Sequence, residues 1–264
     1  MRYSITLSYD GSSFFGWQVQ PGAISVQECL EKALSTLLKE DISVTGAGRT
    51  DTKVNAIGYV AHFDSASEEP LETALLTCKL NAILPPSVVV SGVVREDGDF
   101  HARFDAVRRE YTYFIHRKKD PFVESYSYRC SYPGLDFEAM NEAASLLLGR
   151  HDFSCFEKSG GAAKTPFCTV FEARWTEYTP SHVAIMGPVS EDCSYWYFRI
   201  SADRFLRNMV RAIVGTLMDV GRGRMTLGQF KEVVQRGDRC VAGDSVPAQG
   251  LFLENIEYPE DIFI

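Results

Sequence analysis

The chain has 264 residues, of which 45% are hydrophobic and 23% charged, enough apolar content for one large or two small packed domains. A net charge of −8 argues against a uniformly basic nucleic-acid binder, and no apolar run approaches the roughly 20 residues that cross a bilayer. The seven cysteines include no CxxC pair, so we expect reduced thiols in a cytoplasmic protein. The N-terminal stretch lacks a continuous apolar segment, so we expect no signal peptide.

The first hundred residues alternate between strand and helix patterns. Strands are predicted at residues 2–10, 41–45, 57–63 and 88–94. A helix is predicted from Ser25 to Leu38, because Ser25 and Glu28 form a capping-box pattern and apolar residues then recur at helical spacing. A second helix is predicted to end near Leu80, with Pro70 in its first turn. The resulting order of strands and helices is that of a ferredoxin-like unit.

The turn between the second and third strands, residues 46–55, carries ionisable residues. Gly46 and Gly48 are expected to allow backbone angles closed to other residues, and Arg49 and Asp51 follow at once. A cation and a carboxylate next to a stiff strand suit a site whose geometry must be fixed. The residues alone leave an alternative open, in which Asp51 only hydrogen-bonds its own backbone in an Asx-turn.

The second half reads as a longer version of the same order. Strands are predicted at 109–116, 168–177, 195–201 and 250–258, helices at 136–148, 205–220 and 227–236, and a loop at 149–166. No linker of biased composition separates the halves. We therefore predict an α+β fold of two ferredoxin-like halves, 1–105 and 106–264, with mixed, mainly antiparallel sheets that flank a central cleft.

Positive charge is concentrated in two stretches despite the acidic total. Residues 199–224 hold six arginines and two aspartates, a net charge of +4, and residues 101–119 reach the same net charge. On the predicted helix, Arg204, Arg207 and Arg211 follow at steps of three and four, which indicates a basic stripe. Phosphate binding depends on such local clusters, although a solvated basic face fits Arg207 and Arg211 equally well.

Several stretches resemble, in order, the tRNA pseudouridine synthases of the TruA family. They are YDGSSFFGWQVQP at 9–21, SVQECLEKALSTL at 25–37, FHARFDAVRREYTYFI at 100–115, LLLGRHDFSCF at 146–156, RFLRNMVRAIVGTLMDVGRGR at 204–224 and PAQGLFLENIEYP at 247–259. GRTD at 48–51, followed by a strand that ends in HF, resembles the catalytic loop of the family. That loop usually reads GRTDAGVHA, so Lys53 and Asn55 depart from the pattern where Gly and His are usual.

The resemblance implies an isomerase that converts uridine to pseudouridine in the anticodon arm of tRNA, at positions 38 to 40. It also implies a cytoplasmic homodimer and the pseudouridine synthase fold. No cofactor is expected, because the detached base stays in the pocket and holding it there replaces a bimolecular encounter.

The resemblance further assigns roles to individual residues. Asp51 is expected to be the catalytic residue, which attacks the ribose or the base or takes a ribose proton. Arg204 is expected to keep Asp51 charged, and Tyr111 to stack on the target base. Arg49 resembles the residue that enters the RNA helix where the nucleotide has swung out, and Arg207 is expected to bind substrate. Two alternatives stay open, a half-buried strand position for Tyr111 and an ion pair with Asp51 for Arg49.

Other motifs are incomplete, and other functions stay possible. GAG at 46–48 lacks the third glycine of a dinucleotide fingerprint, and SGGAAK at 159–164 lacks the spacing of a P-loop. The five histidines show no metal-ligand spacing, so no metal is expected. The alternatives are a tRNA-binding paralogue or chaperone without catalysis, and a synthase that acts on other RNA uridines.

Overall fold

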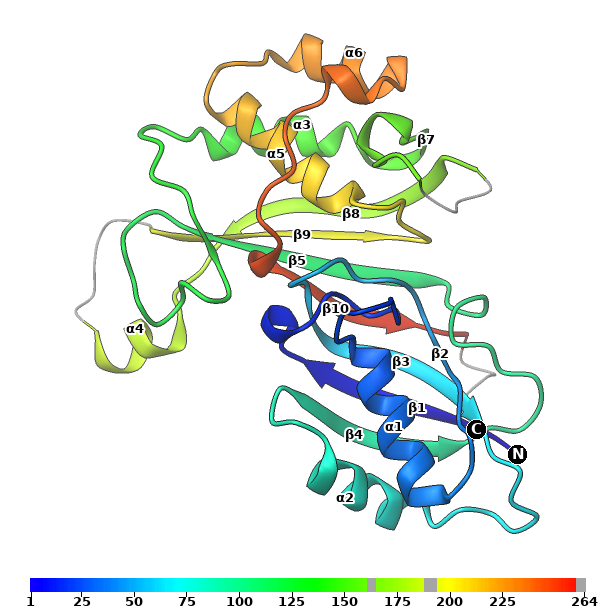
Figure 1. Cartoon of the computed structure of the whole chain (residues 1–264). Helices are drawn as coiled ribbons and strands as arrows, with labels where there is room; N and C mark the ends of the chain where they lie inside the picture. Colours follow the sequence, from blue (N-terminus) through cyan, green and yellow to red (C-terminus); the bar gives the residue numbers. More distant parts are fainter. Residues whose placement is uncertain (161–164, 188–193, 260–264) are drawn as a thin grey trace. The chain divides into compact units, whose positions relative to one another are not determined.

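In the computed structural model, which describes residues 1–160, 165–187 and 194–259, the chain divides into two compact units (Figure 1). The N-terminal unit comprises Met1–Arg109 and Phe252–Ile264, and the C-terminal unit comprises Glu110–Leu251. Each unit combines β-strands with helices, which confirms the predicted α+β class.

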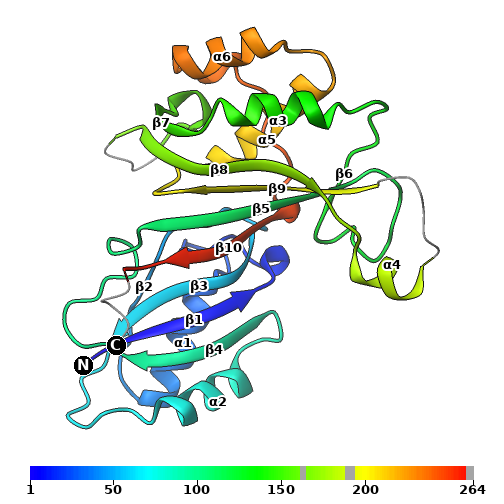
Figure 2. The ribbon, with the colours of Figure 1, turned by 180° about the vertical axis from the view of Figure 1, so that it is seen from behind.

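The N-terminal unit is built on a sheet in which strands far apart in sequence are neighbours. Its strands, in spatial order, are β4 (Val88–Arg95), β1 (Arg2–Tyr9), β3 (Asn55–Asp64) and β10 (Leu251–Glu257), with the short β2 (Val44–Gly46) also paired to β3. Strand β1 runs antiparallel to β3 and β4, whereas β10 runs parallel to β3. Helices α1 (Val26–Leu38) and α2 (Thr73–Ile83) lie on one side of this sheet (Figures 1 and 2). The predicted strand–helix order of this region is confirmed.

The ends of these two helices follow different local rules. The Ser25 hydroxyl accepts a hydrogen bond from the Glu28 N–H at 3.2 Å, so α1 begins where the capping pattern predicts. Helix α2 begins at Thr73, so the prediction that Pro70 lies in its first turn is wrong. The Leu71 N–H instead donates to the Tyr3 hydroxyl at 2.9 Å, which ties the segment before the helix to β1.

The C-terminal unit contributes strands β5 to β9 and, among its described residues, four helices. Its strands, in spatial order, are β5 (Arg108–His116), β9 (Tyr195–Ala202), β8 (Phe167–Glu177) and β7 (Gly149–Asp152), with β6 (Tyr128–Arg129) on the other side of β5. The helices are α3 (Phe137–Ser145), α4 (Ser181–Met186), α5 (Met209–Gly221) and α6 (Leu227–Arg236). Strand β7 falls inside the predicted loop and corrects it, because residues 149–152 pair antiparallel with the start of β8. Helix α4 and strand β6 had no clear sequence signal.

Helix α5 forms the centre of this unit but starts later than predicted. Eleven of its 13 residues are buried. The helix begins at Met209 because Asn208, with φ of 64°, takes a left-handed conformation that ends any helix running into it. Arg204 and Arg207 therefore precede the helix, and the predicted helical stripe of three arginines is wrong, with only Arg211 on α5.

Short 3-10 turns complete the chain at η1 (Gly11–Ser13), η2 (Ser154–Phe156), η3 (Arg239–Val241) and η4 (Ala248–Gly250). The six described cysteines are free thiols, while Cys193 and residues 161–164 of the SGGAAK stretch lie outside the described residues. Among the helices of the described chain, none has the length and apolar character of a membrane span.

Candidate functional site

The loop at residues 46–55 is held by the preceding loop of the N-terminal unit, residues 9–21. The Thr50 hydroxyl lies 2.8 Å from the Tyr9 hydroxyl, and the Thr50 carbonyl accepts from the Trp17 N–H at 3.2 Å. The Lys53 N–H donates to the Phe14 carbonyl at 3.3 Å. Because these bonds come from Tyr9, Phe14 and Trp17, the loop at 46–55 is fixed at both Thr50 and Lys53.

Glycines are needed here for space more than for turn angles. A Cβ on Gly16, which has φ of +90°, would lie 2.4 Å from the Thr50 carbonyl oxygen. A Cβ on Gly46 would lie 2.2 Å from the Tyr59 hydroxyl, whose ring stacks on Trp17 at 4.0 Å. Neither Gly46 nor Gly48 has a positive φ, so the angles expected for them are not adopted. Gly46 instead allows the close packing of two aromatic rings.

The candidate catalytic residues flank a buried threonine. Thr50 is 7% exposed, whereas Asp51 is half-buried and Arg49 is exposed. The Asp51 carbonyl accepts from the Val54 N–H at 3.1 Å, which closes the turn. The inward threonine thus anchors the loop between the half-buried Asp51 and the exposed Arg49.

The two departures from the family pattern have different structural settings. Lys53 has φ of 66°, a left-handed conformation that favours glycine, the residue usual at this position. Asn55 is 2% exposed, and its side-chain oxygen accepts from the Gly11 N–H at 2.8 Å. Asn55 therefore braces the loop at 9–21 and does not present its side chain to solvent, whereas Lys53 is exposed.

In the C-terminal unit, Tyr111 lies against the segment that precedes α5. Its ring meets Phe205 edge to face, with centroids 5.0 Å apart, and it is half-buried on β5. Tyr113, two residues along the same strand, is 0% exposed and donates from its hydroxyl to the Pro247 carbonyl at 2.8 Å. Of these two tyrosines, Tyr113 is the core residue and Tyr111 is the one that solvent reaches.

The segment at residues 203–208 is pinned along its length. The Thr169 N–H donates to the Asp203 carboxylate at 2.8 Å, and the Lys158 N–H donates to the Arg207 carbonyl at 3.0 Å. Burial raises the pKa of the Cys168 thiol to about 12, and the positive charge of Arg204 opposes part of that rise, so Arg204 lies near β8. Arg204 is half-buried and directly precedes Phe205, whose ring packs on Tyr111, while Arg207 is exposed.

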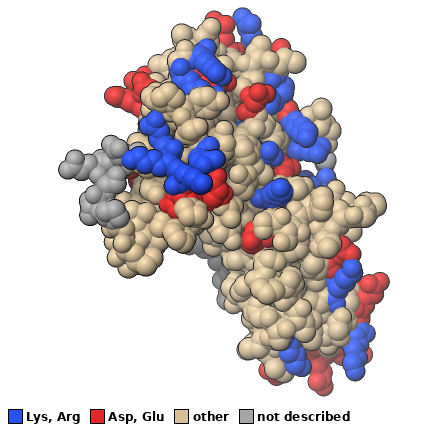
Figure 3. Space-filling model, turned by 60° about the vertical axis from the view of Figure 1, so that its left-hand side comes forward, with Lys and Arg blue, Asp and Glu red and all other residues tan. Residues whose placement is uncertain are grey.

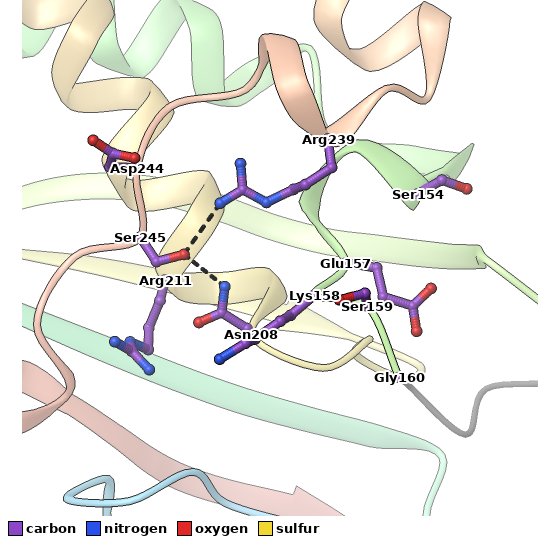
Figure 4. A pocket seen from close by; sticks show the side chains of 10 residues that line it. All are labelled: Ser154, Glu157, Lys158, Ser159, Gly160, Asn208, Arg211, Arg239, Asp244 and Ser245. Carbon is purple, nitrogen blue, oxygen red and sulfur yellow. Dashed lines mark hydrogen bonds between the residues drawn. The ribbon is translucent and has the colours of Figure 1, made fainter.

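A cavity of about 690 Å³ opens beside the start of α5 (Figure 4). Its lining residues are Ser154, Glu157, Lys158, Ser159, Gly160, Asn208, Arg211, Arg239, Asp244 and Ser245. Sequence reasoning missed Lys158, Asn208, Arg239 and Ser245, because they come from separate loops and form no motif. In Figure 3, Lys and Arg side chains gather in groups on the surface, with Asp and Glu side chains between them. Within the described part of the chain, no group of three or more potential metal ligands is present.

Comparisons with known proteins show the family of the chain. The sequence model of the tRNA pseudouridine synthase family matches residues 5–105 and 143–259. The chain belongs to this family. It is 50% identical to "tRNA pseudouridine synthase A" of Bacteroides thetaiotaomicron over 262 residues, which cover 99% of this chain and 92% of the relative. It is 40% identical to the protein of the same name in Bacillus subtilis, over 98% of this chain and 99% of the relative.

Membership of the tRNA pseudouridine synthase family confirms the resemblance drawn from the motifs. Among solved structures, an archaeal box H/ACA sRNP Nop10-Cbf5 complex aligns with 90% of this chain and 59% of its own, at a TM-score of 0.35 and 9% identity. The family model passes through the GRTD loop and the segment before α5, and therefore includes Asp51 and Arg204.

Proposed function

We propose that the chain isomerises uridine to pseudouridine in the anticodon arm of tRNA, at positions 38 to 40, with Asp51 as its catalytic residue. The observation that carries this proposal is the loop at 46–55, where buried Thr50 is anchored to Tyr9 and Trp17 and Asp51 reaches solvent next to it. A carboxylate on a fixed loop is preorganised, so little reorientation is needed when the substrate arrives.

The reaction requires the uracil to leave its ribose through N1, rotate and rejoin through C5. An ionised Asp51 supports this by attacking the ribose or the base, or by removing a ribose proton. Arg204 is proposed to pair with Asp51 and keep it ionised. The chain needs no cofactor for these steps, since the only groups that move are the base and protons.

Three further side chains are proposed to handle the RNA. Tyr111 stacks on the flipped uracil, a role for which its half-buried ring beside Phe205 is suited. Arg49 fills the space that the flipped nucleotide vacates, and its exposure on the loop allows this. Arg207 binds the RNA backbone from an exposed position ahead of α5.

We further propose that the enzyme works as a homodimer in the cytoplasm. The functional halves are proposed to divide as the sequence suggests, with the catalytic loop in 1–105 and the basic segment in 106–264. An enzyme acting on other RNA uridines, or a tRNA-binding relative without catalysis, remains the competing possibility.

The decisive experiment maps pseudouridine in tRNA from cells with and without the gene, alongside purified protein acting on unmodified tRNA transcripts. The proposal expects pseudouridine at positions 38 to 40 only when the protein is present, with turnover unchanged after EDTA treatment and dialysis. Modification at other positions would support the broader synthase, and binding without any modification would support the non-catalytic relative.

A further inference from the structure

We propose that the cavity beside α5 binds a backbone phosphate of the tRNA substrate through Lys158, Arg211 and Arg239, an inference that rests on the proposed function. The cavity lies entirely within the C-terminal unit, between η2, the start of α5 and the loop that follows η3. Its lining includes no residue of the GRTD loop, which belongs to the N-terminal unit.

The charge of the lining favours an anion. Three cations, Lys158, Arg211 and Arg239, line the cavity with two carboxylates, Glu157 and Asp244. In Figure 4 both carboxylates point away from the place where Arg239, Ser245 and Asn208 meet, and the Arg211 guanidinium also lies apart from it. Arg207 adds a further positive charge at the rim, because its guanidinium donates to the Ser159 carbonyl at 3.4 Å.

The two arginines of the lining are held in place before any ligand arrives. The Arg239 guanidinium donates to the Gly243 carbonyl at 3.1 Å and to the Ser245 hydroxyl at 3.3 Å. The Asn208 amide donates to the same hydroxyl at 2.6 Å. Arg211 donates from Nε to the Val246 carbonyl at 2.8 Å. A guanidinium fixed in this way loses less conformational entropy on binding a phosphate, whose geometry its planar fork matches.

The lining suits a nucleic-acid backbone better than a base. All ten lining residues are polar or glycine, so the cavity offers no aromatic platform on which a base stacks. Phosphate and sugar oxygens, in contrast, are contacted mainly by Arg, Lys, Ser and Asn side chains. These are the residue types that surround Ser245.

The test measures tRNA affinity between 0.1 and 1 M salt for Lys158→Gln and Arg239→Gln. Two matched controls, Lys231→Gln and Arg236→Gln, remove the same charge from exposed positions on α6 that do not line this cavity. Log K falls as log salt rises, and each cavity variant is expected to make this slope shallower by about 0.7 to 0.9. This corresponds to a Kd about five- to eightfold higher at 0.1 M salt, with the difference vanishing near 1 M. The controls are expected to keep the wild-type slope.

Lys158 is exposed, so its variant tests the proposal even if Arg239→Gln impairs folding. A wild-type slope in folded Lys158→Gln, or equal losses in the controls, would overturn the proposal. So would tight binding of inorganic phosphate that leaves tRNA affinity unaffected, since the cavity would then be a small-anion site. Failure of the proposed function is distinguishable from this. In that case wild-type protein would form no pseudouridine, whereas the salt dependence of tRNA binding could still be measured for every variant.

Discussion

The loop at 46–55 and the segment at 203–208 both turn the chain through a residue in the left-handed region that is not glycine. In the first this residue is Lys53, with φ of 66°, and in the second it is Asn208, with φ of 64°. Asn208 is a residue type that tolerates this conformation, and its amide donates to Ser245. Lys53 has neither advantage, so its conformation is imposed by the hydrogen bonds of its surroundings.

The contrast shows two ways to fix a functional segment. The loop at 46–55 is clamped from outside, by the Phe14 carbonyl on Lys53 and by Tyr9 and Trp17 on Thr50. The segment at 203–208 is also held from outside, by Thr169 on Asp203 and by Lys158 on Arg207, but its left-handed residue, Asn208, is in addition of a type suited to that backbone angle. Substitutions that leave the clamps intact should therefore change chemistry in the first segment, whereas those in the second should change binding or stability.

The largest effect is expected for Asp51→Asn. An amide keeps the shape of the side chain but is neither a nucleophile nor a base, so turnover should fall by at least about 10³-fold. The Kd for tRNA should stay within a few-fold of wild type, because the clamps on Thr50 are untouched. Single-turnover pseudouridine assays and filter binding measure the two quantities. Wild-type turnover would refute the catalytic assignment, and a folded variant that no longer binds would make Asp51 a structural residue.

Charge reversal at Arg207, in the second segment, and at Arg211, on α5, should affect binding and not chemistry. Arg207→Glu and Arg211→Glu should each weaken tRNA binding and reduce the slope of log K against log salt by about one. Arg207 is exposed and gives the cleaner result, while Arg211 also donates to Val246, so its variant needs a thermal-stability measurement alongside. An unchanged slope for Arg207→Glu would mean that this segment faces away from RNA.

Sequence reasoning was most successful where one local rule dominated. Alternating apolar residues located β1 and β3, and Ser25 located the start of α1. It failed at α5, because the apolar pattern continues through Phe205 and Leu206 and hides the turn at Asn208. It also failed at β7, whose four residues gain their strand pairing from β8 rather than from their own pattern.

The candidate site divides in the same way. The resemblance to the family singled out the GRTD loop and Tyr111, because its motifs are contiguous in sequence, and their roles stay predictions. The anchor of Thr50 on Tyr9 was not predicted, since the two residues are 41 positions apart. The cavity beside the start of α5 was not predicted either. Its cations come from separate segments, which are brought together only when the C-terminal unit folds.

Substitutions of Tyr111 test whether its ring, which packs against Phe205, contacts RNA or belongs to the hydrophobic core. Tyr111→Leu removes the aromatic face and should cost about 1–3 kcal/mol of tRNA binding if the ring stacks on the flipped base. Tyr111→Phe keeps the ring and should bind normally, yet it should stall after glycosidic cleavage if the phenol relays the proton from C5. Equal stability losses in both variants, with full turnover in the folded fraction, would make Tyr111 a core residue.

Substitutions of Asn208 test how much its left-handed conformation matters to the stability of the segment at 203–208. Asn208→Gly keeps access to the left-handed conformation and loses only the bond to Ser245, whereas Asn208→Ala also forces a Cβ into that conformation. The free energy of unfolding of the alanine variant should therefore be about 1 kcal/mol lower than that of the glycine variant. Urea denaturation of both variants measures this difference. If the two are equally stable, the backbone angle of Asn208 carries no cost for alanine and the contrast with Lys53 disappears.

The smallest effect is expected for Lys53→Gly, and it has the opposite sign. A left-handed lysine costs about 1–2 kcal/mol, while glycine costs about 0.5–1 kcal/mol through the entropy of the unfolded chain, so a net gain of roughly 0.5–1 kcal/mol is expected. Lys53→Ala removes the same charge without relieving the backbone, and should give no such gain. Thermal unfolding of the three proteins separates these cases, and tRNA affinity shows whether the exposed ammonium contributes. A loss of affinity shared by both variants would mean that Lys53 is retained for contact with RNA, at the expense of the stability that glycine would give this turn.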